Sequence, residues 1–278
     1  MPTWPSDPPD LLDWPLTVIS EGHTLAEAPR PLADGSILFS DVIAGGVRRI
    51  SRDHETVTEV IPRRRGVGGM LPHADGGLVV TGRDLSYVSP QGESSTIFAP
   101  QGSRGLNDLC SDGAGGVYVG SLKFEALAGG DAVPGEIWQL PAGAAPKLIA
   151  DHIYWPNGIG ISPDGETLYV SDTHKQRVSA IDLATGDHQD LILIEHGIPD
   201  GLAVDEQGNI WLAVGHRGIV GVFNVAGTLI GMIDMPTEFV SSVAFGGPER
   251  EDIVVTSGTK VFHGRAHVPG LPMAAARI

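Results

Sequence analysis

The stretch SPDGETLYVSD, residues 162–172, decides the fold. It joins a polar Asp-Gly turn to an alternating run that ends in small polar and acidic residues. Asp-Gly between alternating apolar segments is the strongest short-range signal for a β-hairpin, because glycine adopts a positive φ at little cost. Variants of this phrase recur six times, 39–50 residues apart, around Gly35, Gly76, Gly115, Gly165, Gly208 and Arg250. The chain therefore repeats one hairpin-containing unit about every forty residues.

Further strand candidates lie between these hairpins. The segments at residues 177–183 and 218–225 alternate with period two, which brings each unit to about four strands. Four strands in about forty residues make one propeller blade, so six copies predict an all-β, six-bladed β-propeller with four-stranded blades. A two-sheet sandwich would also have short strands, but it gives no reason for the repeat. We expect one domain over residues 1–278, with an N-terminal extension over about residues 1–20.

Composition limits the partners of the protein. Acidic residues outnumber basic ones 34 to 18 in 278 residues, a formal net charge of −16, and such a field repels phosphate backbones and anionic lipids. We therefore expect no nucleic-acid partner and no membrane partner. The single cysteine, Cys110, allows no intrachain disulfide, and the N-terminus has no signal-peptide pattern. These features predict a cytoplasmic protein, either a monomer or a weak dimer.

The common local motifs of catalysis are absent from the sequence. It contains no G-x-S-x-G nucleophile elbow, no H-E-x-x-H zinc motif, no G-x-x-x-x-G-K phosphate loop and no G-x-G-x-x-G dinucleotide fingerprint. The ten histidines are scattered without a short-range ligand pair. Any active site must therefore be assembled from residues that are distant in the sequence.

Four polar residues occupy one equivalent position of the repeat. Glu27, Asn107, Asn157 and Asp200 each precede the turn glycine of their unit by eight residues. In a propeller, the innermost strands of successive blades begin around the central channel, so these side chains should converge there. Two carboxylates and two amides offer the oxygen ligands that hard cations such as Ca²⁺, Mg²⁺ or Mn²⁺ prefer. The alternative is that Asn-Gly at 157–158 and Asp-Gly at 200–201 only form turns.

Five segments resemble a known family. They are E-A-P at 27–29, L-N-D at 106–108, W-P-N-G-I-x-x-S-P-D-G-x-x-L-Y-V-S-D at 155–172, P-D-G-L-A-V-D-x-x-G-N-I-W at 199–211 and A-F-G-G-P at 244–248. Together they resemble the SMP-30/gluconolactonase/luciferin-regenerating enzyme family of six-bladed propellers, over about residues 21–257. The resemblance implies that Glu27, Asn157 and Asp200 bind one divalent cation (Ca, Mg, Mn or Zn) and that Asn107 holds a water molecule or the substrate.

The resemblance also implies an activity, the hydrolysis of lactones. A bound cation polarises the lactone carbonyl and stabilises the oxyanion, while Asp200 is the candidate general base for the attacking water. Two alternatives stay open: the same metal site with a different reaction, either hydrolysis of another ester or an isomerisation, and a non-catalytic propeller that binds a partner protein.

One position departs from the family pattern. Sugar lactonases of this family often carry Arg two residues before the Asn of the N-D pair, whereas Gly105 stands there in this chain and Arg104 could replace that group only if the loop bulges. With Tyr154 and Trp155 as further candidate substrate contacts, an apolar or aromatic lactone or ester is at least as plausible as a sugar lactone. The alternative role of both rings is blade packing.

The third repeat interval, from Gly115 to Gly165, is overlong because of an insertion at residues 123–136. It is rich in glycine and follows the Asn107 unit, which predicts a lid in which Phe124 and Glu125 contact the substrate. An inert surface loop is the alternative.

Overall fold

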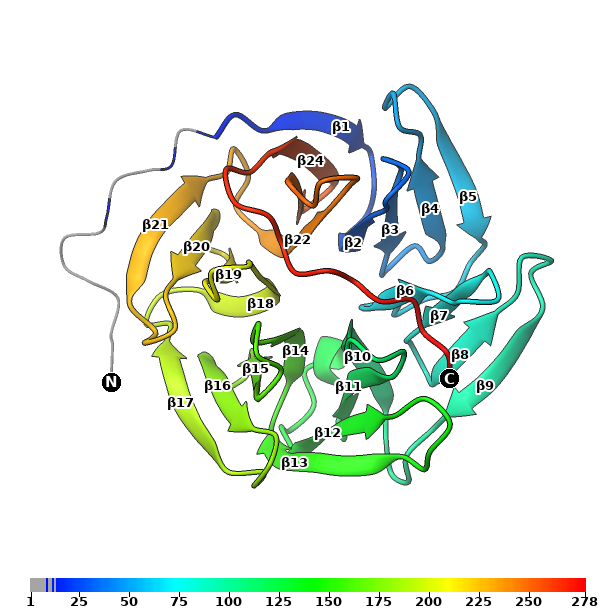
Figure 1. Ribbon diagram of the computed structural model, residues 1–278, viewed down its shortest axis with the longest axis vertical. Coiled ribbons are helices and arrows are strands. Elements are labelled where there is room, and N and C mark those ends of the chain that lie inside the picture. The colour runs from blue at the N-terminus through cyan, green and yellow to red at the C-terminus, as the bar shows by residue number, and fades with distance from the viewer. Residues whose placement is uncertain (1–8, 10–11, 13) are drawn as a thin grey trace.

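A computed structural model describes residues 9, 12 and 14–278, and the remaining N-terminal residues lie outside the described part. The described chain forms 24 β-strands and one short 3-10 helix, η1 (Ala126–Ala128). The strands make six separate four-stranded antiparallel sheets around a central axis (Figure 1), which confirms the predicted six-bladed β-propeller. No helix within the described residues has the length and apolarity to cross a bilayer.

The first three blades each run outward from the axis in sequence order. Blade 1 contains β2 (Ala26–Pro31), β3 (Ile37–Asp41), β4 (Val47–Ile50) and β5 (Val57–Ile61). Blade 2 contains β6 (Met70–Pro72), β7 (Leu78–Val80), β8 (Leu85–Val88) and β9 (Ser94–Phe98). Blade 3 contains β10 (Gly105–Ser111), β11 (Val117–Leu122), β12 (Gly135–Leu140) and β13 (Lys147–Ile153).

The last three blades follow the same plan, except that the outermost strand of blade 6 comes from the N-terminus. Blade 4 contains β14 (Pro156–Ile161), β15 (Thr167–Asp172), β16 (Arg177–Asp182) and β17 (His188–Leu193). Blade 5 contains β18 (Ile198–Val204), β19 (Ile210–Gly215), β20 (Ile219–Phe223) and β21 (Leu229–Asp234). Blade 6 contains β22 (Val240–Gly246), β23 (Asp252–Ser257), β24 (Lys260–Arg265) and β1 (Thr17–Glu21).

The ring closes through blade 6. β1 pairs antiparallel with β24, with Thr17 opposite His263, so the two ends of the propeller are hydrogen-bonded into one sheet. Residues 17–20 of the predicted N-terminal extension thus belong to this blade, while residues 1–8, 10–11 and 13 lie outside the described part. Each blade still has two edges, at its innermost and outermost strands, and these strands are only three to seven residues long.

The hydrophobic core is divided among the interfaces between neighbouring blades. Six clusters of buried side chains each join two adjacent blades. One of them packs Phe39 of blade 1 against Val254 and Val261 of blade 6, across the point of closure. Blade faces therefore supply the cohesion, and the inner strands need not fill the axis with apolar side chains.

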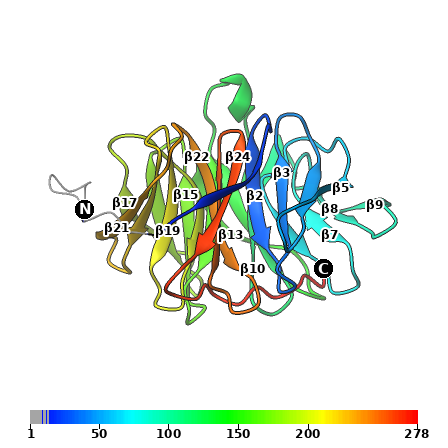
Figure 2. The ribbon, with the colours of Figure 1, turned by 90° about the horizontal axis from the view of Figure 1, so that it is seen from above.

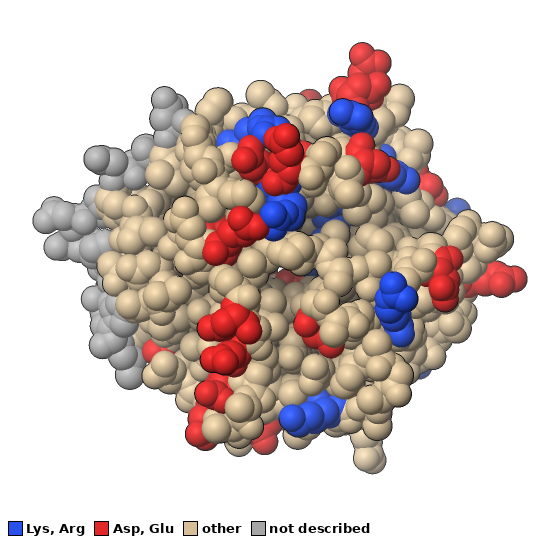
Figure 3. All heavy atoms as spheres, viewed as in Figure 1, with Lys and Arg blue, Asp and Glu red and all other residues tan. Residues whose placement is uncertain are grey.

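The two faces of the disc differ. Figure 2 shows the segment with η1 rising from one face, while residues 266–278 run across the other. This C-terminal segment is held by backbone hydrogen bonds, among them Leu271 N to Val204 O and Ala276 N to Pro72 O. On the face that it crosses, acidic and basic side chains are interspersed rather than segregated by sign (Figure 3).

Candidate active site

Four of the innermost strands carry a β-bulge at the position of the predicted site. The register shifts between Glu27 and Arg30 in β2, between Leu106 and Leu109 in β10, between Pro156 and Ile159 in β14, and between Pro199 and Leu202 in β18. A bulge inserts an unpaired residue and re-aims the neighbouring side chain. Each predicted polar residue lies at such a break in the ladder.

The structure brings the four polar residues together. Glu27, Asn107, Asn157 and Asp200 all line one cavity of about 600 Å³, although they come from four different blades. This confirms the convergence of side chains that their common eight-residue offset predicted. Their chemical roles stay predictions.

Glu27 is held by a strained turn of its own strand. The next residue, Ala28, is buried and has a φ of 50°, in the left-handed region that costs a residue with a Cβ about 1–2 kcal/mol. This conformation lets the Ala28 N–H donate to Glu27 Oε2 at 3.1 Å. The strain is therefore coupled to the orientation of a carboxylate at the cavity.

Asp200 carries the least satisfied polar atom of the site. Its side chain is buried, and its Oδ1 has no hydrogen-bond partner among the described residues. Burial raises the pKa of Asp200 well above its usual range, the negative charge of Asp108 adds to the rise, and a hydrogen bond from Asn157 opposes it. Burial also raises the pKa of Glu27, and the charge of Asp200 raises it further. Two nearby carboxylates are thus both destabilised in their ionised forms.

This donor set fits a divalent cation. An unpartnered buried carboxylate oxygen beside a second carboxylate is costly alone, and a cation would neutralise both groups. No group of three or more His, Cys, Asp and Glu side chains within the described part of the chain is arranged to hold a metal ion. Glu27 and Asp200 would therefore need amide oxygens to complete the set, and those of Asn157 and Asn107 line the same cavity.

The amide nitrogen of Asn157 is committed to protein acceptors. Its Nδ2 donates to Thr173 Oγ1 at 3.2 Å, and the Thr173 hydroxyl donates to Pro199 O at 2.8 Å. The side-chain oxygen of Asn157 is then the atom left for a ligand. Thr173 also lines the cavity and was missed in the sequence analysis; its only signal is its place directly after the S-D that ends the blade 4 hairpin.

The amide of Asn107 links two blades. Its Nδ2 donates to Pro156 O at 3.0 Å, so blade 3 is tied to blade 4 beside the cavity. This bond uses one of the two amide hydrogens and leaves Oδ1 unpaired in that arrangement. The backbone of Gly68 in blade 2 lies so close that a Cβ there would meet Asn107 Oδ1 at 2.4 Å.

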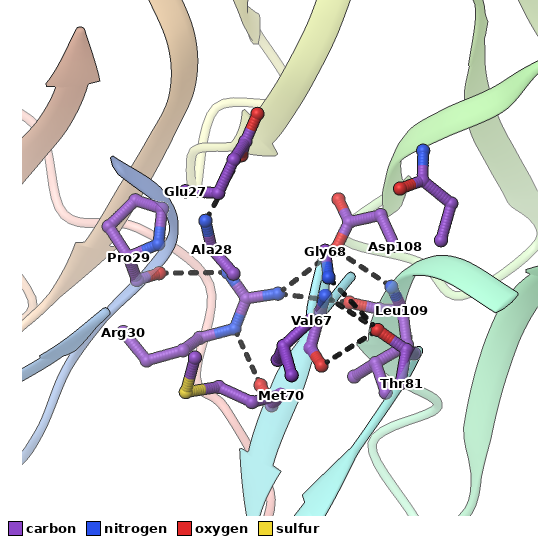
Figure 4. A network of polar contacts seen from close by, with 12 residues as sticks. Glu27, Ala28, Pro29, Arg30, Val67, Gly68, Met70, Thr81, Asp108 and Leu109 are labelled. Carbon is purple, nitrogen blue, oxygen red and sulfur yellow. Dashed lines mark hydrogen bonds and ion pairs between the residues drawn. The ribbon is translucent and has the colours of Figure 1, made fainter. Parts of the chain in front are cut away.

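An ion pair between Arg30 and Asp108, which was not predicted from the sequence, lies beneath these residues. Arg30 Nη2 is 3.4 Å from Asp108 Oδ1; the Asp108 side chain is buried and that of Arg30 is 13% exposed. Figure 4 shows the guanidinium reaching from β2 toward Met70, Asp108 and Leu109. Burial raises the pKa of Asp108 to about 6, and the positive charge of Arg30 opposes this rise. In the sequence, the indication of this pair was the Asp of the L-N-D segment at 106–108.

Arg30 also satisfies carbonyl groups of three strand segments. Its Nε donates to Met70 O at 2.9 Å, its Nη1 to Pro29 O at 2.8 Å and its Nη2 to Leu109 O at 3.0 Å. One cation thus joins blades 1, 2 and 3 at the axis. Arginine suits this role because its planar fork offers five fixed donors.

The insertion lies over the cavity. Phe124, Glu125, Ala126 and Ala128 line it, and the Phe124 ring packs edge-on against Trp155 at 6.0 Å. Phe124 is buried, whereas Glu125 is exposed at the mouth. The segment is therefore positioned as a cover, and its motion as a lid stays a prediction.

The remaining candidate contacts separate into two groups. Arg104 lines the cavity with an exposed side chain, and Trp155 lines it as well. Tyr154 is not among the lining residues: its ring stacks on His174 at 5.6 Å and carries Lys175 Nζ 4.2 Å from its centroid. The Tyr154 ring thus packs against the loop that follows β15, and its role as a substrate contact stays a prediction.

Gly105 lies where two backbone segments of the cavity wall approach each other closely. It lines the cavity, and a Cβ added there would lie 3.2 Å from Gly82 O, so even a small side chain would press on the neighbouring backbone. The backbone of Gly82 forms a bridge with Leu106, which holds this close approach in place.

Fold and site together define a six-bladed propeller with a polar, cation-compatible centre at one end of its channel. The model of the SMP-30/gluconolactonase/LRE-like region matches residues 19–259, and the chain belongs to this family. A pentonolactonase of Haloferax volcanii is 30% identical over 252 residues, covering 86% of this chain and 84% of its own length. A 6-deoxy-6-sulfogluconolactonase of Pseudomonas putida is 27% identical over 282 residues, covering 91% and 95%. The crystal structure of a luciferin-regenerating enzyme superposes with a TM-score of 0.85 at 22% identity, covering 95% of this chain and all of that one.

Proposed function

We propose that this protein is a divalent-metal-dependent hydrolase that opens a lactone ring. The observation that carries the proposal is the buried, unpartnered Oδ1 of Asp200 in a cavity that Glu27 and two asparagine amides also line. Two relatives that cover most of the chain are named lactonases, and this agrees with the chemistry of the site.

Glu27, Asn157 and Asp200 are the residues that would hold the cation. When bound, a divalent cation supplies a Lewis acid that polarises the ester carbonyl and offsets the negative charge of the oxyanion. Asn157 is kept in place by Thr173, and Glu27 is oriented by the Ala28 N–H, so both ligands are set before a substrate arrives. Pre-organised ligands lose little freedom on binding.

Asp200 also serves as the general base. Its carboxylate accepts a proton from water as the water oxygen attacks the carbonyl carbon, and the same proton goes to the ring oxygen when the C–O bond breaks. One hydroxy acid is formed for each water consumed. Asn107, with one free amide hydrogen and its Oδ1, orients the substrate or the attacking water. The cover formed by residues 124–128 limits the access of bulk water.

The test is a pH-stat assay of acid release on the chelator-stripped protein, with Ca²⁺, Mg²⁺, Mn²⁺ and Zn²⁺ added back singly. We expect no ring opening without a cation and recovery with at least one of them. Calorimetry of the same protein measures cation binding independently. Turnover that survives stripping would overturn the metal dependence, and cation binding without turnover on a broad panel of lactones and esters would favour a binding module or another reaction.

A further inference from the structure

The residues directly above the polar centre form an apolar ring. In each blade, the residue two positions before the site position lies at or before the start of the inner strand, and in an extended chain it points to the same side as the site residue. These residues all line the cavity: Leu25, Gly66, Gly105, Trp155, Ile198 and Phe239, and the indole N–H of Trp155 is the one polar side-chain group among them. We call this set the collar. All six blades contribute one member, so a ligand whose carbonyl reaches Asp200 must lie within the collar.

The collar offers few hydrogen-bond donors or acceptors to a ligand. Glycine and aliphatic side chains have no polar atoms, the Trp155 indole N–H is a single donor, and the amide nitrogens nearest below already donate to protein acceptors. Asn157 Nδ2 donates to Thr173, the Thr173 hydroxyl donates to Pro199 O, and Asn107 Nδ2 donates to Pro156 O. A hydroxyl group placed in the collar would therefore lose its bonds to water with only the Trp155 indole N–H to replace them.

Charged groups near the mouth do not change this. Arg104, Glu125 and His216 line the outer part of the cavity, but their side chains are exposed and remain hydrated. The His216 ring, moreover, packs edge-on against Phe239 at 4.8 Å. These groups can contact the outer end of a long ligand, not the ring atoms next to the scissile ester.

We propose that the site selects lactones that carry an alkyl or aryl substituent and disfavours polyhydroxylated lactones. This inference rests on the proposed lactone hydrolysis and names its substrate class. The cavity of about 600 Å³ lies within the usual range of 300–1,000 Å³ for sites that take drug-sized ligands, so it has room for a substituent of several carbons. The substrate class thus differs from the sugar-derived lactones that name the two relatives.

The experiment measures kcat/KM for γ-lactones whose alkyl chain grows from none to six carbons, for dihydrocoumarin and for xylonolactone and gluconolactone. We expect kcat/KM to rise about fourfold per methylene until the cavity is filled. We expect the sugar lactones to fall at least about 100-fold below the alkyl lactones of equal carbon number. Equal or better turnover of the sugar lactones would overturn the inference.

A binding assay without chemistry separates this inference from the proposed function. Calorimetry of the metal-free protein with 2-alkylcyclopentanones, which cannot be hydrolysed, should show an affinity that grows with chain length. If no lactone is opened under any condition but these ketones bind in this order, the hydrolase proposal fails and the collar is supported. If the affinity for the ketones does not depend on chain length, the proposed role of the collar is overturned, whether or not the protein opens lactones.

A variant that replaces one apolar collar side chain by a smaller, hydroxyl-bearing one tests the ring directly. Ile198→Thr adds one hydroxyl to the half-buried collar and should narrow the preference for alkyl over sugar lactones by about tenfold or more. Ile230→Thr, the same exchange on the exposed side of β21, is the matched control and should leave the preference unchanged. Suppose that Ile198→Thr changes neither the unfolding temperature nor the ratio of kcat/KM for alkyl over sugar lactones. This result would contradict the role of the collar.

Discussion

The guanidinium of Arg30 lies 3.4 Å from the carboxylate of Asp108, and this pair connects strands 78 residues apart at the axis of the propeller. Blade faces hold neighbouring blades together, and the clusters of buried apolar side chains among the described residues lie between adjacent blades. Arg30 also satisfies three carbonyl groups and so ties the inner strands of three blades together at the axis. The same pair places a positive charge below the carboxylates of the site.

Removing Arg30 should destabilise the whole ring. Arg30→Met leaves Asp108 buried without its counter-charge, and breaking such a pair costs about 3–5 kcal/mol of unfolding free energy. Denaturant unfolding measures the loss. The double variant Arg30→Met/Asp108→Asn should recover part of it, because no uncompensated charge remains. The control is Arg265→Met, which removes an exposed ion pair with Glu249 and Glu251 and should leave the unfolding free energy unchanged. Additive losses in the double variant would contradict the coupling.

Glu27→Gln should weaken cation binding while preserving the fold. The substitution keeps the shape of the side chain and removes one of the two carboxylate charges at the centre. Calorimetric titration should show at least about tenfold lower affinity. Glu21→Gln, an exposed position on β1, is the matched control. Unchanged affinity in the Glu27 variant would show that this carboxylate is not a ligand.

Asp200→Asn should separate activity from stability. Loss of the general base alone should lower kcat by about 10²–10⁴-fold. Without a cation, the variant should unfold at a temperature at least equal to that of the original protein, since a buried carboxylate without a partner has become neutral. With saturating cation, the order should reverse, because the original protein binds it more tightly. Near-normal turnover in the variant would refute the assignment of the base.

Thr173→Val should act through Asn157. Valine keeps the volume of threonine but offers neither the acceptor for Asn157 Nδ2 nor the donor to Pro199 O. We expect cation affinity to fall about 10–100-fold, as for other residues that orient metal ligands. Thr58→Val on the exposed strand β5 is the control. If both variants bind the cation equally well, Thr173 has only a structural role.

Acid should remove the stabilisation provided by Asp84. Burial opposes its ionisation, but hydrogen bonds from Ser86, Arg64 and Thr96 outweigh it, so the pKa of Asp84 lies below the ordinary 3.8. A carboxyl group with a lowered folded pKa stabilises the protein above the unfolded pKa, and this contribution disappears as pH falls through the folded pKa. Asp84→Asn should therefore lower the unfolding free energy at pH 7 more than at pH 3, measured by denaturant titration. A loss of equal size at both values would disprove the linkage. Asp131→Asn in the exposed insertion is the control.

The repeat and the site position could be predicted because their signals are local. Asp-Gly turns, period-two alternation and the eight-residue offset of Glu27, Asn107, Asn157 and Asp200 depend on backbone preferences within about ten residues. Once four-stranded units repeat six times, closure into a ring follows and equivalent positions must converge. The six-bladed fold and the convergence of these four residues could therefore be predicted from the sequence.

Which residues contact one another across the ring was decided by tertiary structure alone. Nothing near Arg30 in the sequence indicates that it would meet Asp108, and nothing near Tyr154 indicates that its ring would stack on His174 rather than line the cavity. The unpaired oxygen of Asp200 and the apolar collar likewise depend on where other blades place their atoms. Local preferences set the backbone of each strand, whereas burial, charge compensation and the contents of a cavity depend on contacts between distant segments that form only when the ring closes.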